Sequence, residues 1–172
     1  MGTKIGLDCI LYRGEAGAIA PIEMKNVRDL TLNIEKGEAD ITTRAANGWK
    51  MTAATLKEGS IEFDLVYDAQ DSDFNTLEAA FLCDIPLAFF VSDGDGNGLD
   101  CDCDVTKFDL DQSLEEAVKA SVTLKPTNIG GSAGRAPVWR TGVVISGGTV
   151  VNSGAILTSA SVVTSGGTVS NG

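Results

Sequence analysis

The chain has 172 residues, enough for one domain with a sizeable buried core. It holds 24 acidic and 13 basic residues, a formal net charge of −11, and no histidine. A chain without histidine has no Ser-His-Asp triad and no imidazole metal ligand, and so acidic a chain is poorly suited to hold nucleic acid by its phosphates. No apolar run reaches about 18 residues and no signal-peptide pattern opens the chain, so we expect no membrane span and no secretion.

Apolar and polar residues alternate over residues 28–44, on both sides of a Lys36-Gly37 pair. Alternation is typical of strands with one solvated face, and a two-residue Lys-Gly loop would join two such strands in a tight hairpin. The solvated face of that hairpin would carry Asp29, Thr31, Asn33, Glu35, Glu38 and Asp40.

A long connection is expected over residues 43–57, where a Trp and a Met follow an Asn-Gly turn signal. Two interpretations remain open. Trp49 either folds back over its own core or anchors the loop in a neighbouring subunit. The candidate contact residues are Arg44, Asn47, Trp49, Lys50 and Met51.

The next strand is expected over residues 60–67, because every second residue there is large and apolar. A helix capped by Asp71 or Ser72 should follow, with an apolar stripe at spacings of three and four. Pro86 should end the helical region, and residues 87–91 then predict a buried strand.

Residues 93–98 read Asp-Gly-Asp-Gly-Asn-Gly and allow two interpretations. The run matches the start of a calcium loop, with ligands at Asp93, Asp95 and Asn97 and with Asp104 in the last ligand position. The same residue types supply the positive φ angles of a hairpin turn, and the flanks predict strands where a calcium loop of this kind needs helices. We favour the turn and keep the metal site as the alternative.

Two further strands are expected over residues 99–105 and 118–125. In the first, cysteine alternates with an acidic row of Asp100, Asp102 and Asp104. We interpret Cys101 and Cys103 as small buried side chains, since a zinc site usually needs four ligands. The elements together predict a mainly β fold, an antiparallel β-sandwich or barrel with one packed α-helix.

A change of composition marks a boundary near residue 130. All 24 acidic residues lie before it, and a Gly/Ser/Ala run occupies residues 130–134. We therefore divide the chain into a domain of residues 1–129 and an extension of residues 130–172. The extension repeats a Ser-Gly-Gly-Thr-Val motif after 19 positions, too few copies to bury a solenoid core. It is either a mobile tail or a short β appendage.

No motif for catalysis is present. The carboxylates alternate along strands, as on a solvated face, and the chain has neither a nucleophile elbow nor a phosphate-binding loop. We expect no enzyme activity and no cofactor.

Residues 27–49 and 56–63 resemble the signature hairpin and loop of the major tail tube proteins of long-tailed bacteriophages, of the siphophage type. They read VRDLTLNIEKGEADITTRAANGW and LKEGSIEF. The helix after Asp71 falls where that family keeps its helix, and the resemblance extends over residues 5–127. The extension departs from the family pattern, and we expect it on the outside of a tube.

The resemblance implies a structural protein of the virion tail that is assembled in the host cytoplasm. Such proteins form sixfold rings that stack into a hollow tube, and their inner strands join in a ring-wide β-barrel. The implied partners are further copies of the chain, the tape measure, tail terminator and baseplate proteins, and double-stranded DNA that passes through without specific binding.

An acidic bore would repel the phosphates of DNA and keep the DNA mobile. We therefore expect the solvated face of the first hairpin to line the bore, with the Asp100, Asp102 and Asp104 row as second choice. We expect the loop over residues 43–57 to contact an adjacent subunit or ring. The alternative function is a secreted calcium- or carbohydrate-binding β-module or adhesin fragment.

Overall fold

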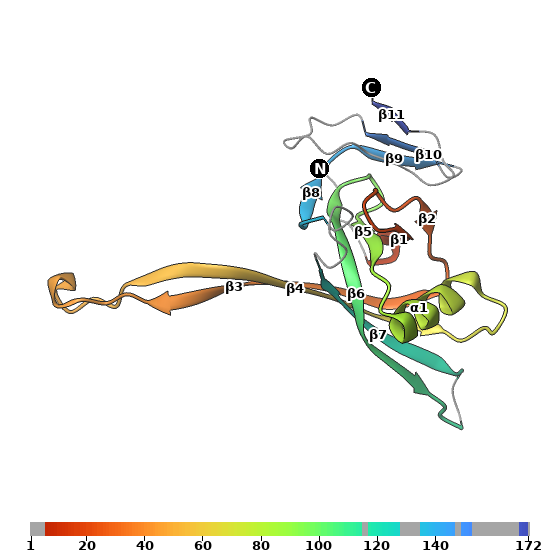
Figure 1. Cartoon of the computed structure of the whole chain (residues 1–172), viewed down its shortest axis with the longest axis horizontal. Coiled ribbons are helices and arrows are strands. Elements are labelled where there is room, and N and C mark those ends of the chain that lie inside the picture. The colour runs from red at the N-terminus through yellow and green to blue at the C-terminus, as the bar shows by residue number, and fades with distance from the viewer. Residues whose placement is uncertain (1–5, 115–116, 128–134, 147–148, 153–168, 172) are drawn as a thin grey trace.

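The computed structural model describes residues 6–114, 117–127, 135–146, 149–152 and 169–171. Its main sheet has the strand order β2-β1-β5-β6-β7-β4-β3, with β8 paired to β6 (Figure 1). Every pair within it is antiparallel, and one α-helix occurs in the described part of the chain, which confirms the predicted fold class. No helix among the described residues is long and apolar enough to cross a membrane.

The elements have the following bounds. The main sheet contains β1 (Ile10–Glu15), β2 (Ile22–Glu23), β3 (Val27–Asp40), β4 (Thr52–Val66), β5 (Leu87–Ser92), β6 (Gly98–Asp111), β7 (Lys119–Pro126) and β8 (Val138–Arg140). A smaller sheet contains β9 (Val143–Ser146), β10 (Thr149–Asn152) and β11 (Val169–Asn171). The helical elements are η1 (Gly6–Asp8), η2 (Arg44–Ala46) and α1 (Ser72–Cys83).

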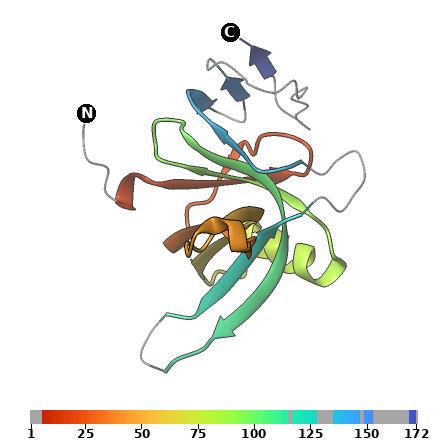
Figure 2. The same cartoon turned by 90° about the vertical axis from the view of Figure 1, so that its left-hand side faces the viewer.

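The strand β6 joins the two halves of the main sheet. Residues 98–103 of β6 pair with β5, and residues 103–111 pair with β7 on the opposite edge. The register shifts between Val105 and Lys107, and such a bulge bends and twists a strand. Beyond the bulge, β6 and β7 run together toward the lower edge of the view (Figure 2).

The core lies between the sheet and α1. Alternate residues of β4 and β7 are buried there, as their sequence pattern predicts: Ile61, Phe63, Leu65, Ala120, Val122 and Leu124. The helix starts where expected, because the Asp71 carboxylate accepts a hydrogen bond from the Asp73 N–H at 3.1 Å. It buries Phe74, Leu77 and Ala80 against this core, which fixes α1 on one face of the sheet.

The tight hairpin expected at Lys36-Gly37 is wrong. β3 continues through this pair, and β4 faces it over most of its length, with Glu35 opposite Glu58. Gly37 is needed for a different reason. A Cβ atom there would lie 2.4 Å from Thr55 Oγ1, and the β3–β4 register shifts at this position. Glycine within a strand often marks such a close approach, which local sequence does not distinguish from a turn.

The outer halves of β3 and β4 form an arm, residues 36–56, which projects from the body (Figure 1). The chain reverses at its tip through η2 and a turn in which Asn47 and Gly48 have φ angles of 50° and 83°. The connection expected over residues 43–57 is therefore shorter than predicted, since β4 already begins at Thr52.

Asp100 and Asp102 are buried, with 1% and 0% of their surface exposed, so the solvated face expected for them is wrong. Arg135 bonds to both carboxylates, at 2.8 Å to Asp100 and 3.2 Å to Asp102. Arg140 pairs with Asp100 at 2.5 Å. We call these four residues the clasp. Their face of β6 is covered by a segment far away in the sequence, which strand alternation cannot reveal.

Asp102 has a further partner, the Gly17 N–H, at 3.0 Å. Burial raises the pKa of Asp102, and the charge and hydrogen bonds of Arg135 oppose that rise. The clasp thus holds two carboxylates in a place where, without the two arginines, their negative charge would be strongly unfavourable.

The described part of the expected extension is attached to the main sheet. β8 pairs with β6, and Val143 is buried in a second, small core with Ile19, Ala20, Ala88 and Phe90. The boundary predicted at residues 130–134 lies outside the described residues. The described parts of the two repeat copies pair with each other: β10 and β11 run parallel, with Val150 opposite Val169, its counterpart 19 positions later.

Loss of one clasp arginine should destabilise the fold. Arg140→Ala removes a cation from a buried pair, and we expect a loss of about 3–5 kcal/mol in the free energy of unfolding, measured by urea denaturation. The matched control is Arg44→Ala at the exposed arm tip, which should change that free energy by less than about 0.5 kcal/mol. Equal urea midpoints for the two variants would show that the clasp adds nothing to stability.

Candidate functional site

One face of the β6-β7-β4-β3 half of the sheet covers the core, and the other is polar. Directly opposite residues of an antiparallel pair share a face, so the register places Thr31 with Glu62 and Glu62 with Thr123. We call this surface the polar face. It comprises Arg28, Thr31, Asn33, Glu35, Glu58, Ser60, Glu62, Asp64, Asp104, Lys107, Asp109, Asp111, Lys119, Ser121, Thr123 and Lys125.

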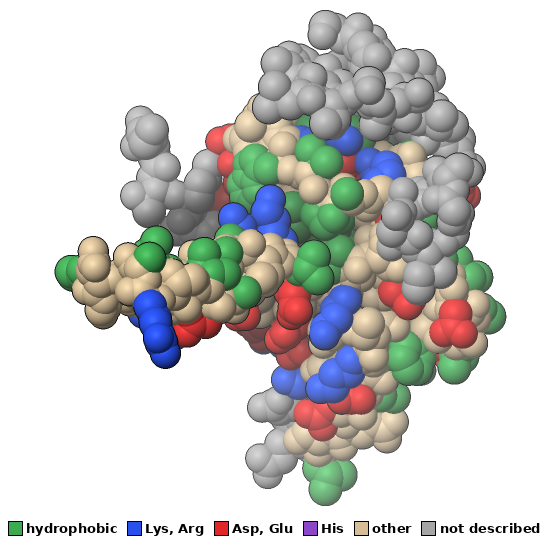
Figure 3. Space-filling model, turned by 60° about the vertical axis from the view of Figure 1, so that its left-hand side comes forward, with side chains coloured by type: hydrophobic (Ala, Val, Ile, Leu, Met, Phe, Trp, Pro, Cys, Tyr) green, Lys and Arg blue, Asp and Glu red, His purple; other side chains and the backbone are tan. Residues whose placement is uncertain are grey.

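Carboxylates outnumber cations on the polar face, but the two kinds are interleaved. Asp64 accepts hydrogen bonds from Ser121 Oγ at 2.6 Å and Lys119 Nζ at 3.0 Å. The Ser121 hydroxyl, followed by Lys119, lowers the pKa of Asp64. Lys107 pairs with Asp109 at 3.0 Å. Acidic and basic side chains gather beside the base of the arm (Figure 3).

The structure brings together only part of the row predicted for the first hairpin. Thr31, Asn33 and Glu35 lie on the polar face. Asp29 lies next to the polar face, within the register shift between Arg28 and Thr31 of β3, and its φ angle is 51°.

Glu38 and Asp40 lie on the arm, an odd number of positions beyond Glu35. Alternation along a continuous strand places such residues on the opposite face. The shared face expected for these residues depended on the hairpin at Lys36-Gly37, and it does not follow from the observed strand.

Two strand edges bound the polar face. β3 pairs with β4 on one side, and among the described residues no strand pairs with its other side. On β6 the pairing with β5 ends at Cys103, so residues 104–111 have β7 on one side and no described strand on the other. Both edges present unpaired backbone N–H and C=O groups, which can pair with another chain.

The arm tip exposes apolar side chains. Trp49 is 76% exposed, and Ile41 and Met51 are about half exposed. Trp49 therefore does not fold back over its own core, which was one of the two interpretations of this loop. No acidic residue lies between Asp40 and Glu58, so the tip is both apolar and cationic. The five candidate contact residues, Arg44, Asn47, Trp49, Lys50 and Met51, all lie at this tip.

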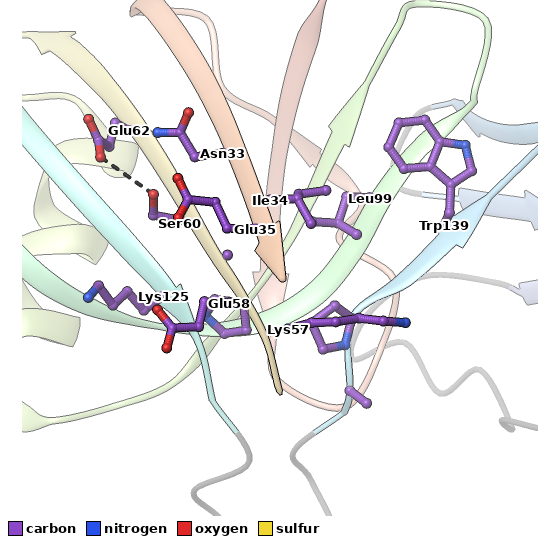
Figure 4. Close-up of a pocket in the computed structure, with 14 residues that line it drawn as sticks. Asn33, Ile34, Glu35, Lys57, Glu58, Ser60, Glu62, Leu99, Lys125 and Trp139 are labelled. Carbon is purple, nitrogen blue, oxygen red and sulfur yellow. Dashed lines mark hydrogen bonds between the residues drawn. The ribbon is translucent and has the colours of Figure 1, made fainter. Parts of the chain in front are cut away.

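A hollow lies at the base of the arm, beside residues 136–139 (Figure 4). Asn33, Ser60 and Glu62 lie on one side of the β3–β4 pair, whereas Ile34, Leu99 and Trp139 lie on the other. Trp139 is 61% exposed. Sequence reasoning missed it, because a lone Trp in a region without periodicity carries no signal of its position.

The Asp-Gly-rich run forms the turn between β5 and β6. The Asp93 carboxylate accepts hydrogen bonds from the N–H groups of Asp95 and Asn97 at 2.9 and 3.0 Å. Asp104 lies farther along β6, opposite Lys125, and is not brought to the turn. Among the described residues no group of three or more Cys, Asp or Glu side chains is placed to hold a metal ion.

Several solved structures share this fold. The tail of an empty gene transfer agent (GTA) particle, refined with C6 symmetry, matches with a TM-score of 0.67 at 15% identity, covering 81% of this chain and all of that one. A chain of the native GTA virion matches with a TM-score of 0.64 at 14% identity over the same shares. The SPP1 tail tube matches with a TM-score of 0.58 at 13% identity, covering 81% of each chain. No curated protein sequence matches the chain significantly.

A family profile described as phage tail tube protein matches residues 5–127, most of the chain. The match covers the span over which the sequence resembles tail tube proteins, and it confirms that resemblance. Proteins of this family are structural components of virion tails, so the expected structural role, virion location and lack of enzyme activity are confirmed with it. The chain belongs to the phage tail tube protein family.

Proposed function

We propose that six copies of the chain close into a ring and that rings stack into a hollow tube through which double-stranded DNA passes. The observation that carries this proposal is a four-stranded unit with an open edge on each side. The GTA tail of the same fold was refined with C6 symmetry, which supports six copies per ring.

The direction of the strands favours closure. β6, β7, β4 and β3 alternate in direction, so the two open edges run antiparallel to each other. β3 of one copy can then pair with β6 of the next in the same antiparallel pattern, without a parallel seam. Repetition around a ring would produce a ring-wide β-barrel that leaves no edge exposed.

The polar face would line the bore of this barrel. α1 and the apolar core lie on the opposite face of the same strands, which places them on the outside. A lining with more carboxylates than cations repels phosphate, whereas a basic lining would bind it through counterion release. The proposed lining residues of β3 and β4 are Asp29, Thr31, Asn33, Glu35, Glu58, Glu62 and Asp64.

The arm would connect one subunit to the adjacent subunit or ring. Its exposed Trp49 and Met51 are the kind of apolar anchors that are buried at interfaces, and Arg44 and Lys50 supply charge beside them. Glu38 and Asp40 lie on this arm, so we expect them at the contact with the adjacent subunit or ring and not in the lining of the bore.

Further partners follow from a tube. A tape measure protein would occupy the bore before DNA, and terminator and baseplate proteins would cap its ends. A baseplate structure, from the anti-feeding prophage, shares the fold with a TM-score of 0.52 at 6% identity. We place residues 130–172 on the tube exterior, because β8 pairs with the first half of β6 and Val143 packs in the second core, and neither lies on β7, β4 or β3. The alternative of a secreted calcium- or carbohydrate-binding module or adhesin fragment has less support, since Asp104 lies apart from the turn and the family is structural.

Trp49→Ala should impair polymerisation without weakening the subunit. The side chain is mostly exposed, so the free energy of unfolding should change by less than about 0.5 kcal/mol. Buried in an interface, the same Trp should contribute about 2 kcal/mol or more to each contact, so we expect few or no tubes by negative-stain microscopy. Trp139→Ala, at the other exposed Trp, is the matched control. Unimpaired tube formation by Trp49→Ala would remove the proposed role of the arm tip.

Charge reversal on the polar face should convert the bore into a DNA-binding channel. In tubes of Glu58→Lys/Glu62→Lys, short duplex DNA should be retained in the bore, be protected from nuclease, and be released as salt is raised. Glu78→Lys on the exposed side of α1 is the control, because DNA attracted to the outer wall should remain digestible. Digestion of the DNA bound by both kinds of tube would show that Glu58 and Glu62 do not face the bore.

A further inference from the structure

Two glutamates face each other on the polar face without a cation. Glu35 and Glu58 are exposed and directly opposite in the β3–β4 register. Like charges at such positions destabilise a strand pair. Within the described residues neither carboxylate forms an ion pair, although Lys125 lines the same hollow. An isolated subunit therefore compensates this repulsion only in part.

Glu35 is also next to the open edge of β3. A strand that pairs with this edge places side chains beside Glu35 on the polar face. In the proposed ring, on which this inference rests, that strand is the second half of β6 from a neighbouring copy. Beyond the bulge its polar-face residues are Lys107, Asp109 and Asp111, in the order cation, acid, acid.

Only registers that differ by steps of two residues keep polar residues on one face and apolar residues on the other. With Lys107 opposite Glu35, Asp109 lies opposite Asn33 and Asp111 opposite Thr31. This register contains one ion pair and no like-charge pair directly opposite each other. Lys107, whose exposed pair with Asp109 exists within the subunit, would then also neutralise the Glu35–Glu58 pair.

The apolar face supports the same register. Phe108 would lie opposite Ile34, and Leu110 opposite Leu32. Ile34 and Leu110 are 53% and 43% exposed in the subunit, an unusual exposure for apolar strand residues that point to the core side of a sheet. Cross-strand pairing would bury both. Next to Phe108, whose ring stacks on Phe81, α1 presents further exposed apolar side chains that would extend the contact.

The neighbouring registers are less favourable. A shift in one direction places Asp109 opposite Glu35, which adds a third carboxylate to the uncompensated pair. A shift in the other direction places Lys107 opposite Asn33 and leaves Glu35 without a cation and Ile34 beyond Phe108. Only the first register satisfies both faces.

We propose that neighbouring subunits join with Lys107 of one copy opposite Glu35 of the next, so that the Lys107–Glu35 pair and the Phe108–Ile34 contact set the register of the ring. This interaction surface consists of the open edges of β3 and β6, and its partner is a second copy of this chain.

A charge-swap experiment tests the proposal. Glu35→Lys and Lys107→Glu alone each place like charges opposite each other at every seam, and we expect each to raise the protein concentration needed for tube formation by about tenfold or more. The double variant Glu35→Lys/Lys107→Glu restores opposite charges and should polymerise near the parental concentration. Both residues are exposed, so neither single variant should melt markedly lower than the parent as an unassembled subunit. Glu35→Lys should melt slightly higher, because it replaces the repulsion from Glu58 with an attraction.

The control is Glu35→Lys/Lys125→Glu, which has the same net charge as the restoring pair but leaves two cations opposed at every seam and should remain defective. If the parent forms tubes and the restoring pair is no better than either single variant, the register is wrong while the ring proposal stands. If the parent forms no tubes at all, the ring proposal fails, and the register fails with it.

Cysteine crosslinking gives a second measurement, in a background with Cys9 and Cys83 replaced by serine because both are exposed. Asn33→Cys/Asp109→Cys should oxidise to a covalent ladder of up to six subunits on a denaturing gel. Asn33→Cys/Lys107→Cys should not. The reverse result would show that the strands pair two residues away from the proposed register.

Discussion

The unpaired backbone of two strand edges is the constraint on which the organisation of this protein depends. β3 and the second half of β6 each carry hydrogen-bonding groups that no described part of the chain satisfies. In a monomer such edges invite uncontrolled pairing, and the chain does not blunt them with proline. Because the unit has four antiparallel strands, its two edge strands run in opposite directions. One edge of a copy can therefore pair with the other edge of the next copy in the same antiparallel pattern, which turns this liability into a means of closure.

Much of the fold follows from the sequence, because burial of one face imposes a period that can be read. Residues 60–67 and 118–125 alternate, and in the structure they are antiparallel neighbours around one core. The cap and stripe of α1 are equally local signals. The prediction that failed depended on a contact between residues far apart in the sequence. Gly37 looks like a turn residue, but it allows the close approach of Thr55 on the partner strand, which local sequence does not reveal.

The polar residues of the site also divide into those whose position follows from local spacing and those whose position depends on distant segments. Thr31, Asn33 and Glu35 were placed correctly on a common polar face, because their spacing alone determines it. Glu38 and Asp40 were assigned to the same face through an incorrect turn. Asp100 alternates like a surface residue, and only the distant Arg135 and Arg140 explain its burial. Alternation shows which side chains share a face, but it does not show whether another segment covers that face.

The clasp has a consequence for the boundaries of the fold. The family profile matches residues 5–127, whereas the cations that neutralise Asp100 and Asp102 lie beyond that span. The span that the profile matches is thus shorter than the unit that is electrostatically self-sufficient in this chain. A chain cut at residue 127 would keep two buried carboxylates and lose both of their arginines, so the C-terminal segment is a necessary part of the charge balance inside this fold.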